Sequence, residues 1–447
     1  MEQDYNVLLF VVDSLRHDVL NDGSGAKTPT INKLKSEGSV FTNCHSQGIS
    51  TAPAMTAMLT GRLPLDYGGH WYLDKEQPTF AEVFRGNGYH TGAIHSNPYV
   101  SARRNFDRGF DHFEEDVVAF EPDGGLEGAP EKFLRLASRA ARIFSRTPYT
   151  PAEEVNEDIL SFVSDAGSPW FLWTQYMDVH GPYLGGDDFS YRNKLRAEWL
   201  WRKAAVRDPD GITDAEHEEL RSNYRREVEY LDGAIGNLLE ELNDSGELQN
   251  TFVVLTADHG DEFYEHGCYG HGNLPYDELT HVPLIIRPPD ESDLPRGEIV
   301  DELVRCMDIL PTVIDAVGAN LSEQHQERLA GETLLPLVNG QNRDEEPLVV
   351  TEKRVRGEDD LRIGFRTTQW KYLYDGTDDN RYLYNLTEDP EETTDVSGQN
   401  PDVIDEFESH LRERLTRIDE TSANVEIPDL NTGAGVEERL KALGYRK

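Results

Sequence analysis

Short apolar runs of strand length alternate with amphipathic segments through the first three quarters of the chain. The apolar runs predict strands at residues 7–12, 91–95, 170–176, 251–257 and 282–287. The segments between them carry apolar positions at helical spacing and predict helices near residues 28–37, 53–60, 78–87, 153–165, 213–243 and 307–317. Strands that are separated by helical crossovers predict an α/β fold, with a central, mostly parallel sheet flanked by helices.

After about residue 345 the pattern changes to short strands separated by turns, at residues 347–351, 361–366 and 370–374, followed by a helix at 402–418. The chain has 447 residues, which is more than a single core usually supports. We therefore predict a main domain at residues 1–345 and a small antiparallel α+β subdomain at 346–447. Two polar stretches, 115–155 and 184–212, are longer than ordinary connections and are predicted as insertions near the mouth of the site.

Two of the predicted strands are followed directly by residues of types that commonly bind metals. Asp13 follows the run 7–12, and Asp258-His259 follows the run 251–257. Strand ends of an open α/β sheet converge at one edge, and a carboxylate and imidazole set suits a divalent ion. The alternative for Asp258-His259 is a hydrogen-bonded pair at a strand end, and Gly260 permits a sharp turn there. Asp13 favours the metal site because buried carboxylates are rarely unpaired, and the pattern indicates a metal-assisted ester-cleaving enzyme.

Thr51 opens a predicted helix that has Pro53 in its first turn and Gly61 just past its end. In one interpretation, Ser50 or Thr51 is the N-cap of that helix. In the other, Thr51 is a nucleophile beside the metal, and the helix N-terminus stabilises an anionic phosphoryl or sulfuryl group. The residues by themselves leave both interpretations open.

Two histidines are further candidates. His180 follows the predicted strand 170–176, and His271 lies in a Gly-His-Gly segment after Asp258. A lone histidine at such a place is usually structural, but the strand-end position of His180 adds weight to a functional role. His271 is a candidate for holding an anion or protonating a leaving group.

The composition excludes several classes of partner. Lys and Arg number 43 against 84 Asp and Glu, so the formal net charge is −41, which repels nucleic acid and anionic lipid. The acidic residues are spread along the chain, as in proteins adapted to high salt, so we expect a halophilic protein. Cys44, Cys268 and Cys306 form neither a disulfide framework nor a thiolate metal site. Without a signal-peptide pattern or a membrane-spanning apolar run, we expect a cytoplasmic protein.

Several motifs, in the same order along the chain, resemble the sulfatase family of the alkaline phosphatase superfamily, in a haloarchaeal type with Thr at the nucleophile position. The motifs are Asn6 to Asp13 with Ser14-Leu15-Arg16, Thr51-Ala52-Pro53 through Pro64, Gly109-Phe110-Asp111, Met177 to Tyr183, Asp258 through Pro283, Arg366 to Tyr372 and Leu383 to Pro390. The resemblance implies an alkaline-phosphatase-like sandwich with a C-terminal subdomain.

The resemblance also implies roles for individual residues around one divalent metal ion, which could be Ca, Mn, Mg or Zn. It implies Asp13, Asp258 and His259 as metal ligands, Thr51 as the nucleophile, His180 and His271 as catalytic contacts to the sulfate or phosphate, and Asn97 as a substrate-binding residue.

Two departures from the family pattern change the expected chemistry. The usual pair of adjacent aspartates is Asp13-Ser14 here, as in the sparser single-metal sites of phosphonate monoester hydrolases and lipoteichoic-acid-synthase-type transferases. Sulfatases carry Cys or Ser, oxidised to formylglycine, in a C/S-x-P-x-R motif, whereas this chain has Thr51, and Met55 replaces the Arg. Because threonine cannot become formylglycine, that cofactor is not expected, and the chemistry favours phosphoryl transfer.

The predicted function is a metal-dependent hydrolase of sulfate or phosphate/phosphonate esters that acts on a small-molecule or glycan ester. One alternative is a phosphoryl- or phosphoglycerol-type transferase. Another is a catalytically degenerate homologue that binds an anion or glycan, which the missing Arg and the single Asp13 favour. The presence of the other candidate residues together favours an enzyme, and the sequence makes no prediction of oligomeric state.

Overall fold

The computed structural model describes residues 5–21, 23, 25–66, 71–74, 78–115, 149–184, 190–354 and 361–422.

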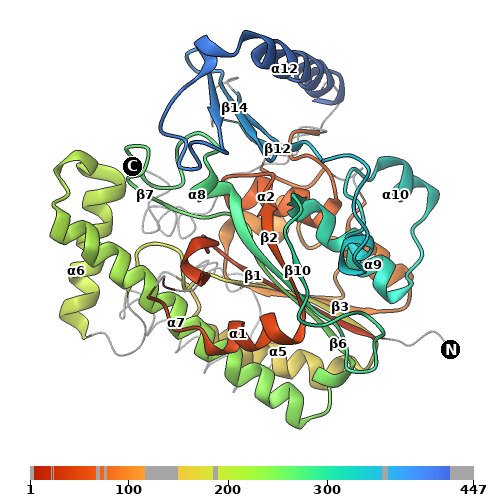
Figure 1. The fold of residues 1–447 in the computed structure, drawn as a ribbon. Helices are drawn as coiled ribbons and strands as arrows, with labels where there is room; N and C mark the ends of the chain where they lie inside the picture. The colour runs from red at the N-terminus through yellow and green to blue at the C-terminus, as the bar shows by residue number, and fades with distance from the viewer. Residues whose placement is uncertain are drawn as a thin grey trace.

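A nine-stranded mixed sheet forms the centre of the protein (Figure 1). The strand order is β10-β2-β9-β6-β1-β5-β3-β4, with β11 also paired to β2. All pairs are parallel except those of β9 with β2 and β6. The strands are β1 (Asn6–Val12), β2 (Ser39–His45), β3 (His90–His95), β4 (His112–Glu115), β5 (Trp170–Tyr176), β6 (Thr251–Ala257), β9 (His281–Arg287), β10 (Ile299–Val300) and β11 (Val304–Arg305). The prediction of a mostly parallel sheet is confirmed.

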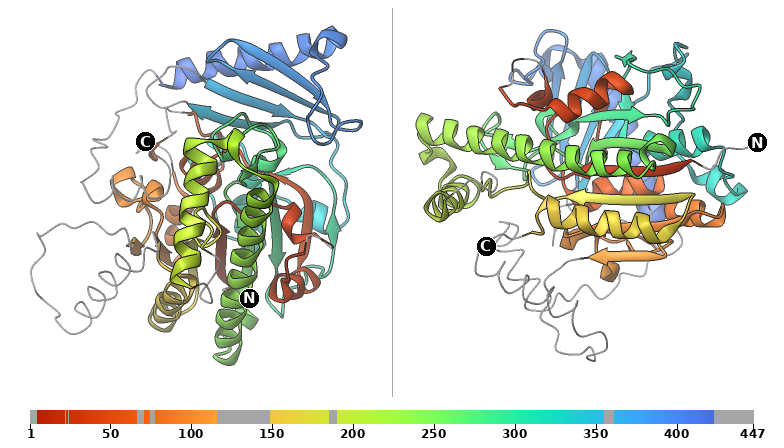
Figure 2. Two further views of the ribbon diagram at one scale, coloured as in Figure 1. Left: turned by 90° about the vertical axis from the view of Figure 1, so that its left-hand side faces the viewer. Right: turned by 90° about the horizontal axis from the view of Figure 1, so that it is seen from below.

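Helices cover both faces of this sheet, as Figures 1 and 2 show. One face carries α1 (Pro29–Glu37), α5 (Ala152–Ala166) and α7 (Asp214–Asp244), and the other carries α2 (Thr51–Thr60), α3 (Phe80–Gly86) and α9 (Ile309–Val317). The six predicted helices are therefore present, with small shifts at their ends. Further helices are α6 (Tyr191–Arg202), α8 (Asp277–Thr280), α10 (Glu323–Arg328) and α11 (Leu335–Val338).

The central strands set the position of the candidate site. Every residue of β1, β5 and β6 is buried, as expected for parallel strands that are covered on both faces. Val12 is in register with Ala257 of β6 and with Tyr176 of β5, and His95 of β3 is in register with Gln175. The carboxyl ends of β6, β1, β5 and β3 therefore lie side by side at one edge of the sheet.

A second, four-stranded antiparallel sheet follows along the chain. It consists of β12 (Val349–Arg354), β13 (Leu361–Arg366), β14 (Trp370–Asp375) and β15 (Asn380–Asn385), and α12 (Pro401–Ser422) lies across it (Figure 2). Tyr372 and Phe407 stack between the sheet and the helix, with ring centroids 5.6 Å apart. The predicted C-terminal antiparallel sheet is confirmed, although its fourth strand, β15, was not predicted. The domain boundary between residues 345 and 346 stays a prediction.

The predicted insertions are described only in part. Residues 116–148 and 185–189 lie outside the described residues, and the rest of the second stretch contains α6. No helix within the described ranges is long and apolar enough to cross a membrane. The cytoplasmic location and the adaptation to high salt stay predictions.

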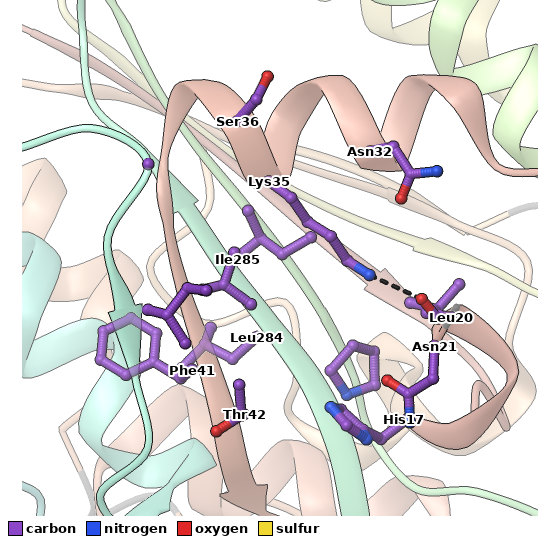
Figure 3. Close-up of a pocket in the computed structure, with 14 residues that line it drawn as sticks. His17, Leu20, Asn21, Asn32, Lys35, Ser36, Phe41, Thr42, Leu284 and Ile285 are labelled. Carbon is purple, nitrogen blue, oxygen red and sulfur yellow. Dashed lines mark hydrogen bonds between the residues drawn. The ribbon is translucent and has the colours of Figure 1, made fainter. Parts of the chain in front are cut away.

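A surface groove lies between α1 and the strands β2 and β9 (Figure 3). Its floor includes Phe41, Leu284 and Ile285, and Lys35 crosses it to donate a hydrogen bond to the Leu20 carbonyl oxygen at 2.7 Å. The lining contains none of the site residues that the sequence predicts.

Candidate active site

Asp13, Asp258 and His259 meet at the ends of β1 and β6. All three side chains are fully buried, and each offers one ligand atom within 4.8 Å of the others. His259 Nε2 lies 3.8 Å from Asp13 Oδ1 and 3.6 Å from Asp258 Oδ2. His259 Nδ1 lies 2.8 Å from the Gly260 carbonyl oxygen, which can only accept, so Nδ1 carries the proton and Nε2 carries the lone pair. The structure therefore brings the three predicted metal ligands together.

The electrostatics of this group fit a divalent cation. Burial raises the pKa of Asp13 to about 6, with repulsion from Asp258 as the next cause, and burial raises the pKa of Asp258 to about 7. His259 Nε2 is buried and has no hydrogen-bond partner among the described residues. Two buried carboxylates beside an unused imidazole lone pair are costly without a cation, and this donor set suits Mn, Zn, Mg or Ca.

In the described part of the chain, two other groups of three side chains also come close enough to share an ion: His259, Asp261 and His271, and Glu262, His266 and Glu278. In the first group, Asp261 already accepts hydrogen bonds from His271 Nδ1 and from the Tyr183 hydroxyl. In the second, both ring nitrogens of His266 are engaged, with Glu278 and with the Glu392 carbonyl oxygen. The group of Asp13, Asp258 and His259 is therefore the better candidate.

The backbone around the metal ligands is tightly constrained. Ser14 has a φ of 62°, which is strained for a non-glycine residue. Its amide donates to Asp258 Oδ1 at 3.3 Å and its hydroxyl to Asp13 Oδ1 at 3.1 Å. A Cβ atom at Gly260 would lie 2.1 Å from the Glu278 carbonyl oxygen. Gly260 is thus required by close packing, and its role in a sharp turn after the strand stays a prediction.

Thr51 is the first residue of α2, and its hydroxyl points to the metal ligands. Thr51 Oγ1 donates to Asp13 Oδ2 at 3.1 Å. Ser50 occupies the N-cap position with extended backbone angles, but its side chain makes no capping hydrogen bond. Side-chain capping therefore does not account for either hydroxyl, and the buried Thr51 hydroxyl is directed at the carboxylate pair.

Asn97 completes the hydrogen bonds on this side of the site. It follows β3 by two residues, and its Oδ1 accepts a hydrogen bond from the Tyr99 amide at 2.8 Å. That contact fixes the orientation of the side-chain amide. Asn97 Nδ2 consequently donates to Asp13 Oδ2 at 2.7 Å and approaches Thr51 Oγ1 at 3.2 Å.

His180 and His271 lie close together beside the metal ligands. Their ring centroids are 5.3 Å apart, and the ring of His271 lies 4.4 Å from that of His259. His180 Nδ1 donates to the Gly181 carbonyl oxygen at 2.6 Å, and His271 Nδ1 is 2.7 Å from Asp261 Oδ1. Burial lowers the pKa of His271 to about 3. All seven predicted site residues therefore belong to one cluster.

The sequence interpretation missed two side chains of this cluster. Gln175, the penultimate residue of β5, donates through Nε2 to Asp13 Oδ2 and Asp258 Oδ2, each at 3.1 Å. Asp261 accepts hydrogen bonds from His271 and Tyr183, both at 2.7 Å. A polar residue near the carboxyl end of an apolar strand was the signal for Gln175, and the second carboxylate in the segment 258–261 was the signal for Asp261.

Two family profiles together and a curated relative match most of this chain. The Sulfatase family profile matches residues 5–319, and the profile "N-sulphoglucosamine sulphohydrolase, C-terminal" matches residues 264–421. Arylsulfatase K of Xenopus laevis is 24% identical over 465 residues, which cover 94% of this chain and 84% of the relative.

Solved structures of two phosphonate monoester hydrolases share the fold. The enzyme of Agrobacterium radiobacter aligns with a TM-score of 0.70 at 18% identity, over 93% of this chain and 96% of that chain. The enzyme of Silicibacter pomeroyi aligns with a TM-score of 0.71 at 21% identity, over the same shares of both chains. Because the first profile spans well over half of the sequence, the chain belongs to the sulfatase family and is a sulfatase-like ester hydrolase.

Proposed function

We propose that this protein is a metal-dependent hydrolase of phosphate or phosphonate esters in which Thr51 is the nucleophile. The observation that carries the proposal is the hydrogen bond from Thr51 Oγ1 to Asp13 Oδ2, which directs the hydroxyl away from a capping role. The substrate is a small-molecule or glycan ester.

The identity of residue 51 argues for phosphorus over sulfur chemistry. Formylglycine forms by oxidation of Cys or Ser to an aldehyde, and the side chain of Thr51 cannot yield that group. The sulfated hydrate of formylglycine expels sulfate by collapse to the aldehyde, a route that is closed to a simple alcohol ester. A phosphorylated threonine, in contrast, can be attacked at phosphorus by water.

The residues that would hold the cation are Asp13, Asp258 and His259. Their two negative charges balance one divalent ion, and His259 Nε2 offers its lone pair at the same place. A divalent ion supplies Lewis acidity, which lowers the pKa of an oxygen bound to it and neutralises charge on a phosphoryl group.

The protein's own groups position the nucleophile. Asp13 Oδ2 accepts the Thr51 hydroxyl proton in a hydrogen bond, so an oxygen lone pair remains available for in-line attack on phosphorus. Asn97 Nδ2, 3.2 Å from Thr51 Oγ1, limits rotation of the hydroxyl. The nucleophile is thereby held in one orientation before the substrate binds.

Three groups surround the place where charge develops. The N-terminus of α2 carries partial positive charge at Thr51, which favours a phosphoryl group there. His180 and His271 lie beside the metal ligand His259 and are our candidates for contacts with the equatorial oxygens or the leaving group. Attack by Thr51 Oγ1 breaks the bond between phosphorus and the ester oxygen, and the alcohol leaves with the proton that Thr51 gives up. Water then attacks phosphorus in the phosphothreonine intermediate, the Thr51 oxygen leaves and regains a proton from that water, and phosphate or phosphonate is released.

The test compares four p-nitrophenyl esters with the metal-reconstituted protein in high salt: a sulfate, a phosphate monoester, a phosphodiester and a phosphonate ester. We expect one of the phosphorus esters to be hydrolysed fastest. We also expect Thr51→Val to lower kcat/KM at least about 10³-fold. Intact mass after acid quenching should show one added phosphoryl group on wild-type protein and none on Thr51→Val.

Thr56→Val is the matched control. Thr56 is a buried threonine of the same helix, and its hydroxyl donates to the Ala52 carbonyl oxygen at 2.8 Å. This variant should keep its activity within a few-fold. Faster hydrolysis of the aryl sulfate than of every phosphorus ester, or full activity of Thr51→Val, would contradict the proposal.

A further inference from the structure

Gln175 occupies the space between the two carboxylates of the candidate metal site. It comes from β5, the neighbour of β1, where it is in register with Val11 and, on the other side, with His95. Its side chain is fully buried, and its Nε2 lies 3.1 Å from both Asp13 Oδ2 and Asp258 Oδ2. The amide thus bridges the same two carboxylate groups that a cation would bridge.

The other atom of this amide, Oε1, is buried and has no hydrogen-bond partner among the residues that the structure describes. Rotation of the amide by half a turn exchanges Oε1 and Nε2 at nearly unchanged volume. In the present orientation Nε2 donates to both carboxylates and Oε1 has no hydrogen-bond partner among the described residues. After the rotation, Oε1 faces the carboxylates and Nε2 takes the former place of Oε1.

The distances fit an oxygen ligand at this position. Oxygens that bind Mg²⁺ or Ca²⁺ lie about 2.0 to 2.6 Å from the ion, so neighbouring ligands of an octahedral shell are about 2.8 to 3.7 Å apart. The separations of 3.1 Å from Gln175 Nε2 to Asp13 Oδ2 and Asp258 Oδ2 fall in this range. After rotation, Oε1 would stand at one corner of such a shell.

The neighbourhood also explains why another ligand is needed. Ser14 stands beside Asp13, and its hydroxyl is directed to Asp13 Oδ1 at 3.1 Å. Asp13, Asp258 and His259 supply three side chains, whereas hard divalent cations take six or more ligand atoms. A neutral amide oxygen adds a ligand without adding to the two negative charges already present.

From these contacts we infer that Gln175 is a further metal ligand, whose side-chain oxygen joins Asp13, Asp258 and His259 around the cation. The inference rests on the proposed metal site and concerns a residue of a different strand. The competing explanation is that Gln175 only shields the empty carboxylate pair and is displaced when the ion binds. The two explanations predict opposite effects of removing the amide.

The test measures binding of Ca²⁺, Mg²⁺ and Mn²⁺ separately to the chelator-treated full chain by titration calorimetry. Gln175→Met keeps the length of the side chain and removes the amide, and Gln175→Leu is the second variant. If Gln175 is a ligand, the affinity for the ion that binds wild type best falls at least about tenfold in both variants. If Gln175 only shields the carboxylates, the affinity stays equal or rises, because the competing hydrogen bonds are gone.

Luminescence of bound Tb³⁺ gives a readout that does not depend on the metal-free state. Decay rates in H₂O and D₂O report the number of water molecules on the ion, and we expect one additional water in Gln175→Met. Thr174→Val is the control, because Thr174 is the adjacent buried residue of β5 and its hydroxyl has no hydrogen-bond partner among the described residues. This variant should match wild type in both measurements.

The outcomes separate the inference from the proposed metal site. If wild type binds the ion and Gln175→Met binds it equally or more tightly, the role of Gln175 is overturned and the metal site stands. An unchanged number of water molecules on Tb³⁺ in Gln175→Met has the same meaning. Absence of binding by wild type overturns both the metal site and this inference. Weaker binding by the Gln175 variants, with retained thermal stability in chelator and a normal Thr174→Val control, supports the inference.

Discussion

The contact between Asp261 and His271 allows a quantitative test of how the site is positioned. Asp261 Oδ1 accepts a hydrogen bond from His271 Nδ1, and Oδ2 accepts one from the Tyr183 hydroxyl, both at 2.7 Å. Burial alone raises the pKa of the Asp261 carboxyl, but the hydrogen bond from His271 holds it below its usual value. Asp261 is therefore ionised and orients the His271 ring toward the metal ligands.

The substitution Asp261→Asn keeps the shape of the side chain and removes its charge. A hydrogen bond to a charged acceptor contributes about 1.5 to 3 kcal/mol when the alternative is a neutral or missing partner. If this energy is what holds His271 in its reactive orientation, the loss corresponds to about a 10- to 150-fold lower kcat/KM. The decrease should lie mainly in kcat, because His271 is proposed to act on the reacting group.

Steady-state hydrolysis of the fastest p-nitrophenyl ester is the assay, with thermal unfolding to verify the fold of each variant. Tyr183→Phe is the matched control, since it removes one neutral donor and leaves the carboxylate. A neutral hydrogen bond contributes about 0.5 to 1.5 kcal/mol, so Tyr183→Phe should lose about two- to tenfold. If Asp261→Asn stays within twofold of wild type, or is less damaging than Tyr183→Phe, the positioning role is refuted.

Two further predictions concern stability. Because burial raises the pKa of Asp13 to about 6 and of Asp258 to about 7, their stabilising contribution is complete below about pH 4 and is lost as the pH rises through those values. Chelator-treated protein should therefore unfold at lower urea concentration at pH 7.5 than at pH 5. A divalent cation should restore the stability at pH 7.5. An unchanged or opposite pH trend in chelator would contradict this reasoning. Arg414 of α12 pairs with Glu352 and Asp66, both buried, so Arg414→Met should cost about 3 to 5 kcal/mol in urea unfolding. A loss below about 1 kcal/mol would show that these carboxylates are not buried in solution.

Much of the fold follows from local pattern. The apolar runs 7–12, 170–176 and 251–257 correspond closely to β1, β5 and β6, because strands that are buried on both faces are predominantly apolar. The strands β2, β10 and β11 were not predicted. β2 mixes buried and half-buried positions, and the other two have two residues each, so none carries a periodic signal.

The candidate site was partly accessible from the sequence for the same reason. Asp13 and Asp258 directly follow apolar strands, and parallel strands place their carboxyl ends at one edge of a sheet. Gln175 and Asp261 were missed because their importance lies in contacts with residues far away in the chain or on another loop. Hydrophobic periodicity reports which face of a segment is buried and contains no information about such partners.

The sequence by itself determined the strand and helix pattern, the strand-end carboxylates and the presence at residue 51 of a threonine, which cannot become formylglycine. Only the tertiary structure showed that the Thr51 hydroxyl reaches a carboxylate and does not cap the helix, because this depends on which acceptor lies near it in space. That acceptor is Asp13, 38 residues earlier in the chain, and it is brought within 3.1 Å by the packing of α2 against the sheet. The structure also placed Gln175 between two carboxylates, since only the parallel register of β6, β1 and β5 makes those three side chains neighbours.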